Sequence, residues 1–200
     1  IHNLKMSKLY NVLLLKILKE IIPATKLSIK KGNKIFGAAI LSKKDLSTLI
    51  IGTNNEILNP LYHGEISAIN SFYSSNICNT INTKDCIFLS THEPCSLCLS
   101  AITWSGFDNF YYFFPYSDTQ NKFNIPHDVN ILKEVFRLDK SKYNNNNQYW
   151  ESYSIIDEND KLSNSEKMEN NKYIEKIYKE YEFLSNYYQK LKFSNKIPLK

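Results

Sequence analysis

Two cysteines three residues apart are the side chains of this sequence best suited to hold a metal ion together. Cys95 and Cys98 follow Pro94 and a short apolar run that is typical of a strand. If a helix begins there, both sulfurs lie on one face of its first turn, and the positive end of the helix favours both thiolates. A redox-active Cys-x-x-Cys pair has the same spacing, so the pair alone leaves that alternative open.

A histidine and a glutamate earlier in the chain supply what the cysteine pair lacks. His63 lies thirty-two residues before Cys95, and Glu65 follows it at the start of a run with helical periodicity. One imidazole and two thiolates leave one position of tetrahedral zinc for water, which is typical of catalytic zinc. A four-cysteine structural site is the alternative, although the remaining cysteines, Cys78 and Cys86, have no paired spacing.

The pattern His63-x-Glu65 followed by Pro94-Cys95-x-x-Cys98 resembles the signature of the zinc-dependent cytidine deaminase-like superfamily. The resemblance implies that zinc is bound by His63, Cys95 and Cys98, and that helices sandwich a mixed sheet. Zinc lowers the pKa of a bound water from about 15.7 to about 7. Glu65, which is not a ligand, would accept the water proton, deliver it to a ring nitrogen and protonate the departing amine.

The resemblance covers about residues 35–115. Within the superfamily, this part of the sequence is similar to one branch in particular. The dipeptides Ala101-Ile102 and Tyr111-Tyr112 resemble the branch of guanine deaminase, tRNA adenosine deaminase and fungal cytosine deaminase. The run His-Gly-Glu-Ile-Ser at the first ligand looks more like the fungal cytosine enzyme. These local similarities point to different members of the branch, so the substrate stays open between them.

The resemblance also implies candidates for contact with the substrate. Family members place an asparagine from the loop after the second strand against the base, and Asn54 is the best match, followed by Asn55. Both asparagines are equally explained as turn residues. Aromatic side chains for a stacking wall, each also suited to the core, are Tyr62, Trp104, Phe114 and Trp150.

The apolar periodicity predicts a sheet covered by helices. A helix is expected over Tyr10–Ile22, ended by Pro23. The elements that follow have the order β-β-α-β-α-β, with strands at Ile35–Leu41, Leu49–Thr53, Cys86–Ser90 and Phe110–Phe114 and helices at His63–Tyr73 and Cys95–Ser105. We therefore expect an α/β fold, a three-layer α-β-α sandwich with a mixed sheet of about five strands, the later ones parallel.

The last third of the chain is expected to add mainly helices. Asp128–Leu138 predicts a helix, Trp150–Ile156 a last strand or a lid segment, and Glu166–Leu191 a long amphipathic helix. With 200 residues the chain has room for one ordinary α/β core and appendages. The predicted organisation is a cytidine deaminase-like zinc domain at residues 1–160 and a C-terminal helical extension at residues 161–200.

The formal net charge of +5 is unevenly distributed along the chain. Residues 1–44 carry ten Lys and one acid, residues 45–160 carry six basic and fourteen acidic residues, and residues 161–200 carry nine Lys and five acids. Basic ends suit a phosphate backbone or simply a solvated surface. Arg137 is the one arginine, which disfavours bidentate recognition of phosphates or guanine edges.

The sequence predicts a cytoplasmic zinc-dependent hydrolytic deaminase without a membrane span. Its small-molecule substrate would be a nucleobase or nucleoside of guanine or cytosine type, converted to the oxo form with release of ammonia. A tRNA adenosine-to-inosine deaminase is the alternative, although the segments around the motifs are acidic. A non-catalytic partner subunit is a third, but such subunits typically lack the glutamate that Glu65 provides. A homodimer is expected by family analogy.

Overall fold

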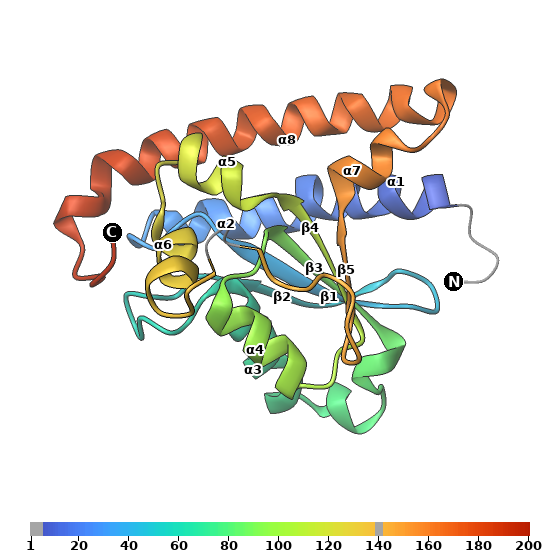
Figure 1. The fold of residues 1–200 in the computed structure, drawn as a ribbon, viewed down its shortest axis with the longest axis horizontal. Coiled ribbons are helices and arrows are strands. Elements are labelled where there is room, and N and C mark those ends of the chain that lie inside the picture. The colour runs from blue at the N-terminus through green and yellow to red at the C-terminus, as the bar shows by residue number, and fades with distance from the viewer. Residues whose placement is uncertain (1–5, 139–141) are drawn as a thin grey trace.

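The computed structural model describes residues 6–138 and 142–200, which fold around one five-stranded sheet (Figure 1). Its strands are β1 (Gly37–Ser42), β2 (Thr48–Thr53), β3 (Cys86–His92), β4 (Asn109–Phe114) and β5 (Glu151–Ser154). They lie in the order β2-β1-β3-β4-β5. β1 is antiparallel to β2 and β3, whereas β3, β4 and β5 are parallel. The sheet is mixed, as predicted, and Trp150–Ile156 contains its last strand.

Both faces of the sheet are apolar, and the residues that face each side alternate along the central strands. One buried cluster contains Ala39, Leu41, Ile87, Leu89, Tyr111 and Phe113. The other contains Ala38, Ile40, Phe88, Phe110 and Tyr112. Successive side chains of a strand point to opposite faces, so strands that are apolar at every position need a cover on both sides. The predicted three-layer α-β-α sandwich is confirmed.

Two helices cover the face of the sheet that carries the second cluster. They are α3 (Gly64–Ser74) and α4 (Ser96–Trp104), which lie below the sheet in Figure 1. Ala68 and Phe72 of α3 and Ile102 of α4 are buried against the strands. Short 3₁₀ turns at Asn76–Asn79 and Thr83–Asp85 then lead into β3.

The N-terminal helical segment lies on the opposite face and is longer than predicted. It comprises α1 (Met6–Lys16), a π-helical turn (Ile17–Ile21) and α2 (Ile22–Ile29), so the prediction that Pro23 ends the helix is wrong. The N–H of Ile22 donates to the carbonyl of Ile17, five residues back, and the hydrogen-bonding pattern restarts there. Pro23 therefore stands in the first turn of α2, where the N–H that proline lacks is not needed.

The chain after β4 adds α5 (Tyr116–Asn121), α6 (His127–Glu134), α7 (Ile155–Asp160) and α8 (Asn164–Leu191), followed by a 3₁₀ turn at Lys192–Ser194. α8 runs alongside α1 and α2 (Figure 1) and buries the apolar stripe predicted for it, including Ile177, Tyr181 and Leu184. α6 ends before Leu138, and the two six-residue helices α5 and α7 were not predicted. Among the described residues, no helix has the length and apolar character needed to cross a membrane.

Candidate active site

The two sequence motifs come together where α3 and α4 begin. His63 directly precedes α3 and Cys95 directly precedes α4, and both have an extended backbone, with φ and ψ of −68° and 164° and of −66° and 171°. Cys98 lies in the first turn of α4. The N-termini of two helices therefore meet at the ligands, and their positive ends favour thiolates there.

The three predicted ligand atoms are close enough to share one metal ion. His63 Nδ1 lies 3.4 Å from Cys95 Sγ and 3.7 Å from Cys98 Sγ, and the two sulfurs are 3.6 Å apart. Tetrahedral zinc, with bonds of about 2.3 Å to sulfur and about 2.0 Å to nitrogen, requires ligand atoms roughly 3.5–3.8 Å apart. The donor set fits zinc, and within the described ranges it is the one cluster of three such ligands.

Gly64, between the ligand His63 and Glu65, lets α3 begin directly against the sheet. A Cβ atom at position 64 would lie 2.9 Å from the Cα of Gly37 on β1. A Cβ atom at Gly52 on β2 would lie 2.3 Å from the carbonyl oxygen of Gly64. No side chain fits into either space, so the first turn of α3 packs on the backbone of both strands and thereby places the ligand and the carboxylate.

Glu65 points from the first turn of α3 toward the ligands and is 4% exposed. Its Oε1 accepts a hydrogen bond of 2.9 Å from Ser90 Oγ, and its Oε2 lies 3.3 Å from Cys98 Sγ. Burial raises the pKa of the Glu65 carboxyl, and the neighbouring Cys95 adds to the increase. A carboxyl group with a raised pKa exchanges protons closer to neutral pH than an exposed one does.

The ligands alter one another's protonation. The pKa of Cys95 lies well below the ordinary thiol value, chiefly because of the hydrogen bond between its sulfur and that of Cys98. Burial raises the pKa of Cys98. Burial also acts to lower the pKa of His63, but the hydrogen bond with Cys95 and the negative charges of Cys95, Glu65 and Glu56 together outweigh it and raise the pKa to about 9. Because metals bind the thiolate form, Cys95 is the sulfur that loses its proton first.

A cavity of about 310 Å³ opens beside His63 and Cys95. Most of its wall is apolar, formed by residues such as Phe36, Leu61, Leu97, Ile125, Ile131 and Leu199. Three charged side chains, Lys34, Glu56 and Asp128, also line it. Burial raises the pKa of Asp128, and the charge of Cys95 adds to the increase. An apolar wall with a few polar groups is typical of a small-molecule site.

The segment that follows α8 forms part of this wall. Ile197, Pro198 and Leu199 line the cavity. The side chain of Asn195 holds the segment in place by donating a hydrogen bond of 2.9 Å to the carbonyl of Gly32. Part of the predicted C-terminal extension, residues 161–200, therefore contributes to the candidate site.

The residues predicted to contact the substrate are not among those that line this cavity. Asn54 is 1% exposed, its Oδ1 accepts a hydrogen bond of 2.6 Å from the N–H of Gly64, and its Nδ2 donates to Glu56 at 2.9 Å. Asn55 lines, with Asn54, a different hollow beside α2 and β2. The N–H of Asn55 donates to the carbonyl of Tyr62, the neighbour of the ligand histidine. Substrate contact by these three residues stays a prediction.

The other aromatic candidates also lie apart from the cavity wall. Trp104, at the end of α4, is 90% exposed. Phe114 is fully buried and packs against the ring of Tyr181 from α8. Trp150 packs on Phe110 with ring centroids 4.9 Å apart. A stacking role for these residues likewise remains a prediction.

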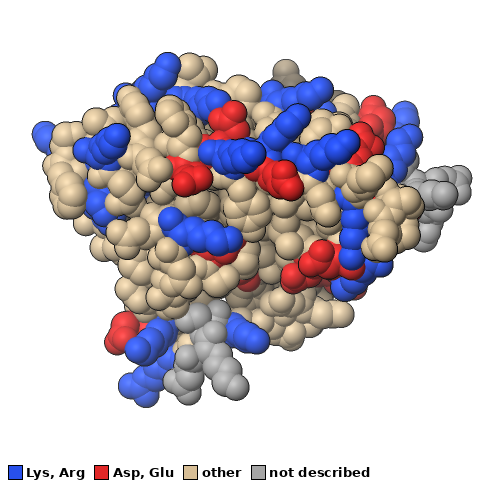
Figure 2. All heavy atoms as spheres, turned by 90° about the horizontal axis from the view of Figure 1, so that it is seen from above, with Lys and Arg blue, Asp and Glu red and all other residues tan. Residues whose placement is uncertain are grey.

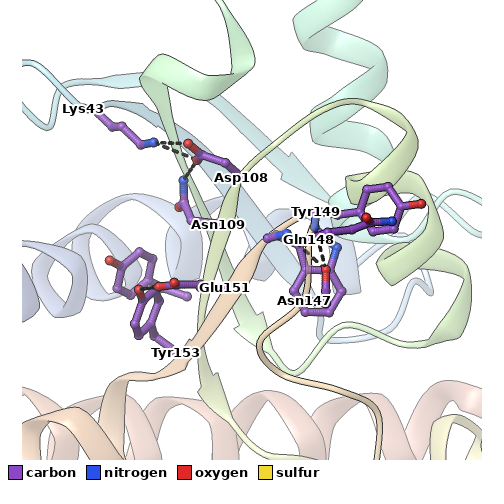
Figure 3. Close-up of a pocket in the computed structure, with 10 residues that line it drawn as sticks. Lys43, Asp108, Asn109, Asn147, Gln148, Tyr149, Glu151 and Tyr153 are labelled. Atoms are coloured by element: carbon purple, nitrogen blue, oxygen red, sulfur yellow. Dashed lines mark hydrogen bonds and ion pairs between the residues drawn. The ribbon is translucent and has the colours of Figure 1, made fainter.

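Trp150 borders a second hollow of about 400 Å³ at the edge of the sheet formed by β4 and β5 (Figure 3). Figure 3 shows Lys43 reaching toward Asp108, with 2.7 Å between Nζ and Oδ1, while Glu151 and Tyr153 project from β5. None of the three metal ligands lines this hollow, so it is separate from the cavity beside His63.

The charged groups of the cavity were not indicated by any sequence motif. Lys34 is one of ten lysines in residues 1–44, and Asp128 stands near the start of an ordinary amphipathic helix. Glu56 is the one acid between the second strand and His63. That isolated charge is the only signal the sequence offered, and it does not reveal which side chains share the wall.

Comparison with known proteins agrees with this geometry. A family model described as the cytidine and deoxycytidylate deaminase zinc-binding region matches residues 14–114, which include all three ligands. Guanine deaminase of Bacillus subtilis (strain 168) is 35% identical over 72 residues, which make up 35% of this chain and 44% of that protein. The chain therefore matches less than half of the length of this relative.

Solved structures share the fold at low sequence identity. A guanine deaminase from Nitrosomonas europaea superposes with a TM-score of 0.50 and 18% identity, covering 77% of this chain and 80% of that one. A mutant of NE0047 in complex with 8-azaguanine gives a TM-score of 0.51 and 14% identity, covering 81% and 80%. Since the family model spans half of the chain and contains its metal ligands, this protein belongs to the family of the cytidine and deoxycytidylate deaminase zinc-binding region.

Proposed function

We propose that this chain is a zinc-dependent hydrolytic deaminase that acts on an amino-substituted nucleobase or nucleoside. The observation that carries the proposal is the 3.3 Å contact between Glu65 Oε2 and Cys98 Sγ. The other two ligands, His63 and Cys95, line a small-molecule cavity. Three protein ligands leave one position of a tetrahedral zinc free. A buried carboxylate next to that position is the group that hydrolytic deamination needs for its proton transfers.

The residues of the site have separate tasks in this reaction. His63, Cys95 and Cys98 would hold zinc, which when bound would supply a water of lowered pKa for the ring carbon that bears the amino group. Glu65 accepts the first proton that the water loses and passes it to the ring nitrogen. It then takes the remaining proton from the hydroxyl group added to the ring carbon and gives it to the amine, which leaves as ammonia while the carbonyl forms. Ser90 holds Oε1 of this carboxylate, which leaves Oε2 directed toward the ligands.

The cavity supports a base as the substrate. Its apolar wall suits the faces of an aromatic ring, and its charged groups suit the polar edge of that ring. Lys34 can donate a hydrogen bond to a ring carbonyl, and Asp128 can pair with an N–H group or a ring nitrogen. Guanine and cytosine both carry a ring carbonyl beside such nitrogens. The sequence similarity to a guanine deaminase supports guanine as the first base to test.

A substrate panel tests this function. The zinc-loaded chain is incubated with guanine, cytosine, cytidine, adenosine and a tRNA anticodon stem-loop, and released ammonia is measured for each. We expect turnover of guanine or cytosine that is absent from the Glu65→Ala variant. Turnover of none of the five substrates by fully zinc-loaded protein would contradict the proposed activity.

Deamination of adenosine in tRNA is the alternative, and one observation favours it. The bond from Asn195 to Gly32 joins the sequence neighbours of Lys196 and Lys31, both exposed, at the segment whose continuation lines the cavity. Lysines beside a site attract a phosphate backbone. On the face that carries α8, however, acidic side chains stand among the lysines (Figure 2). Deamination of the tRNA stem-loop at a rate that decreases steeply with added salt would support this alternative.

We also propose that the chain forms a homodimer, as the family resemblance implies. In support, Trp104 is a large apolar side chain that the single chain leaves 90% exposed on the outer side of α4. Light scattering after gel filtration measures the molecular mass in solution. We expect a dimer that Trp104→Lys weakens, whereas Met168→Lys, on the distant helix α8 and also exposed, leaves it unchanged.

A further inference from the structure

A buried ion pair lies directly behind the ligand His63. Lys34 Nζ is 2.7 Å from Glu56 Oε1, and the two side chains are 6% and 1% exposed. Among the described residues it is the one lysine–acid pair in which both partners are buried to this degree. Charged side chains are almost never buried unless paired, and a buried pair is weak evidence of a contribution to stability. The burial of this pair therefore calls for an explanation other than stability.

The carboxylate of Glu56 is held in one orientation by several donors. Its Oε2 accepts hydrogen bonds from the backbone N–H of Lys34 at 3.2 Å and from Asn54 Nδ2 at 2.9 Å. Asn54 in turn accepts a hydrogen bond of 2.6 Å from the N–H of Gly64, the residue after His63. The carboxylate is thus connected to the start of α3, from which the ligand imidazole projects.

The imidazole of His63 lies between this carboxylate and the two sulfurs. Its Nδ1 faces Cys95 and Cys98, whereas its Nε2 lies 3.9 Å from Glu56 Oε1. That distance is too long for a direct hydrogen bond, but a buried negative charge acts on the ring across it. The charge favours the tautomer with its proton on Nε2, which leaves the lone pair of Nδ1 for the metal.

We propose that Glu56 is a positioning residue that fixes the orientation and tautomer of His63 for metal binding, while Lys34 neutralises its buried charge. This inference rests on the ligand set of the proposed deaminase but not on the identity of its substrate. Carboxylates behind a ligand histidine typically change metal affinity about 10–100-fold when they are removed. The effect belongs to zinc binding itself and is measured without any substrate.

The test compares zinc affinity in four versions of the full chain. Wild type, Glu56→Gln, the double variant Lys34→Met/Glu56→Gln and a control, Glu180→Gln, are freed of metal and titrated with zinc against a chelating dye. Glu180 is a matched control because it also forms a short ion pair, 2.6 Å from Lys26, but on the surface. The side chain of Lys26 is 41% exposed and that of Glu180 is 37% exposed. The thermal midpoint of each metal-free protein reports folding.

We expect Glu56→Gln to raise the dissociation constant for zinc about 10–100-fold, and the control to change it by less than about twofold. The double variant carries no unpaired buried charge and so folds more stably than Glu56→Gln, yet it should remain as weak in zinc binding. Wild-type zinc affinity in Glu56→Gln would overturn the proposal. So would recovery of affinity together with stability in the double variant, because Glu56 would then act only by compensating Lys34.

Discussion

Cys98 Sγ and Glu65 Oε2 are 3.3 Å apart, so a metal ligand from α4 and a carboxylate from α3 are in direct contact. Neither motif implies this contact by itself, because each fixes only the local spacing within its own helix start. The contact places the carboxylate beside any ion held by the sulfur. The proposed roles of the two groups can be tested separately, by removing the carboxylate of Glu65 or by removing a ligand.

Glu65→Ala should abolish turnover while leaving the metal bound. The substitution removes the carboxylate that we propose moves protons but none of the three ligands, and general acid–base groups contribute about 10²–10⁴-fold to a rate. Ammonia release and zinc content are measured on the same preparation. A rate close to that of the wild type would exclude the proton-transfer role of Glu65.

Cys95→Ala should lower the zinc content together with the activity. It removes the thiol whose pKa is lowest, and the remaining two ligands do not complete a tetrahedral site. Cys78→Ala is the matched control, since Cys78 lies outside the ligand cluster. Zinc is measured by atomic absorption after gel filtration, and full occupancy in Cys95→Ala would contradict the ligand set.

Gly64→Ala should destabilise the fold and disturb the metal site at the same time. The new Cβ would lie 2.9 Å from the Cα of Gly37 and 3.1 Å from its N and C atoms, so the start of α3 has to move away from β1. Overpacking of this kind costs about 1–3 kcal/mol. Urea unfolding measures the loss, and zinc titration shows whether the displacement of His63 weakens metal binding. Unchanged values in both measurements would refute the close packing described above.

Asp128→Asn should raise the KM for the base with little effect on zinc content. Asp128 lines the cavity but is not one of the clustered ligands. Losing a charged hydrogen-bond partner costs a ligand about 1.5–3 kcal/mol, or roughly 10–150-fold in affinity. Asp160→Asn, an exposed position at the end of α7, serves as the control. Equal KM values for both variants would remove Asp128 from the substrate contacts.

His92→Phe should make the stability of the protein less sensitive to acid. His92 is enclosed by aromatic rings, including those of Phe36, Phe114 and Tyr181, and burial lowers its pKa well below the ordinary value of 6.5. Below about pH 6.5 the unfolded chain binds a proton that the folded chain does not. The free energy of unfolding therefore decreases as the pH decreases, by up to about 1.36 kcal/mol per pH unit.

Urea unfolding of wild type and His92→Phe between pH 7 and pH 5 checks this prediction. Both proteins share all other titrating groups, so the difference between their unfolding free energies isolates the histidine. We expect the unfolding free energy of His92→Phe to increase relative to that of the wild type as the pH falls. Parallel pH profiles would mean that His92 does not titrate differently in the two states.

Much of the fold was predictable because its signals are local. Strands β1 to β4 and helices α3, α4 and α8 follow from apolar periodicity and agree with the expected ranges within a few residues. The continuation of the N-terminal helix through Pro23 was not predictable, because a π-helical turn changes the hydrogen-bonding pattern without changing the apolar spacing. The six-residue helices α5 and α7 are too short to show a period.

The sequence by itself determined the metal chemistry, since ligand type and short spacing decide which ion a helix start can hold. Only the tertiary structure decided what surrounds that ion. Lys34, Glu56, Asp128 and residues 197–199 are far apart along the chain. They share one wall because the connection between α2 and β1, the loop before α3, helix α6 and the segment after α8 converge there. Such a wall depends on long-range packing, and residues that are brought together by packing share no periodic pattern in the sequence.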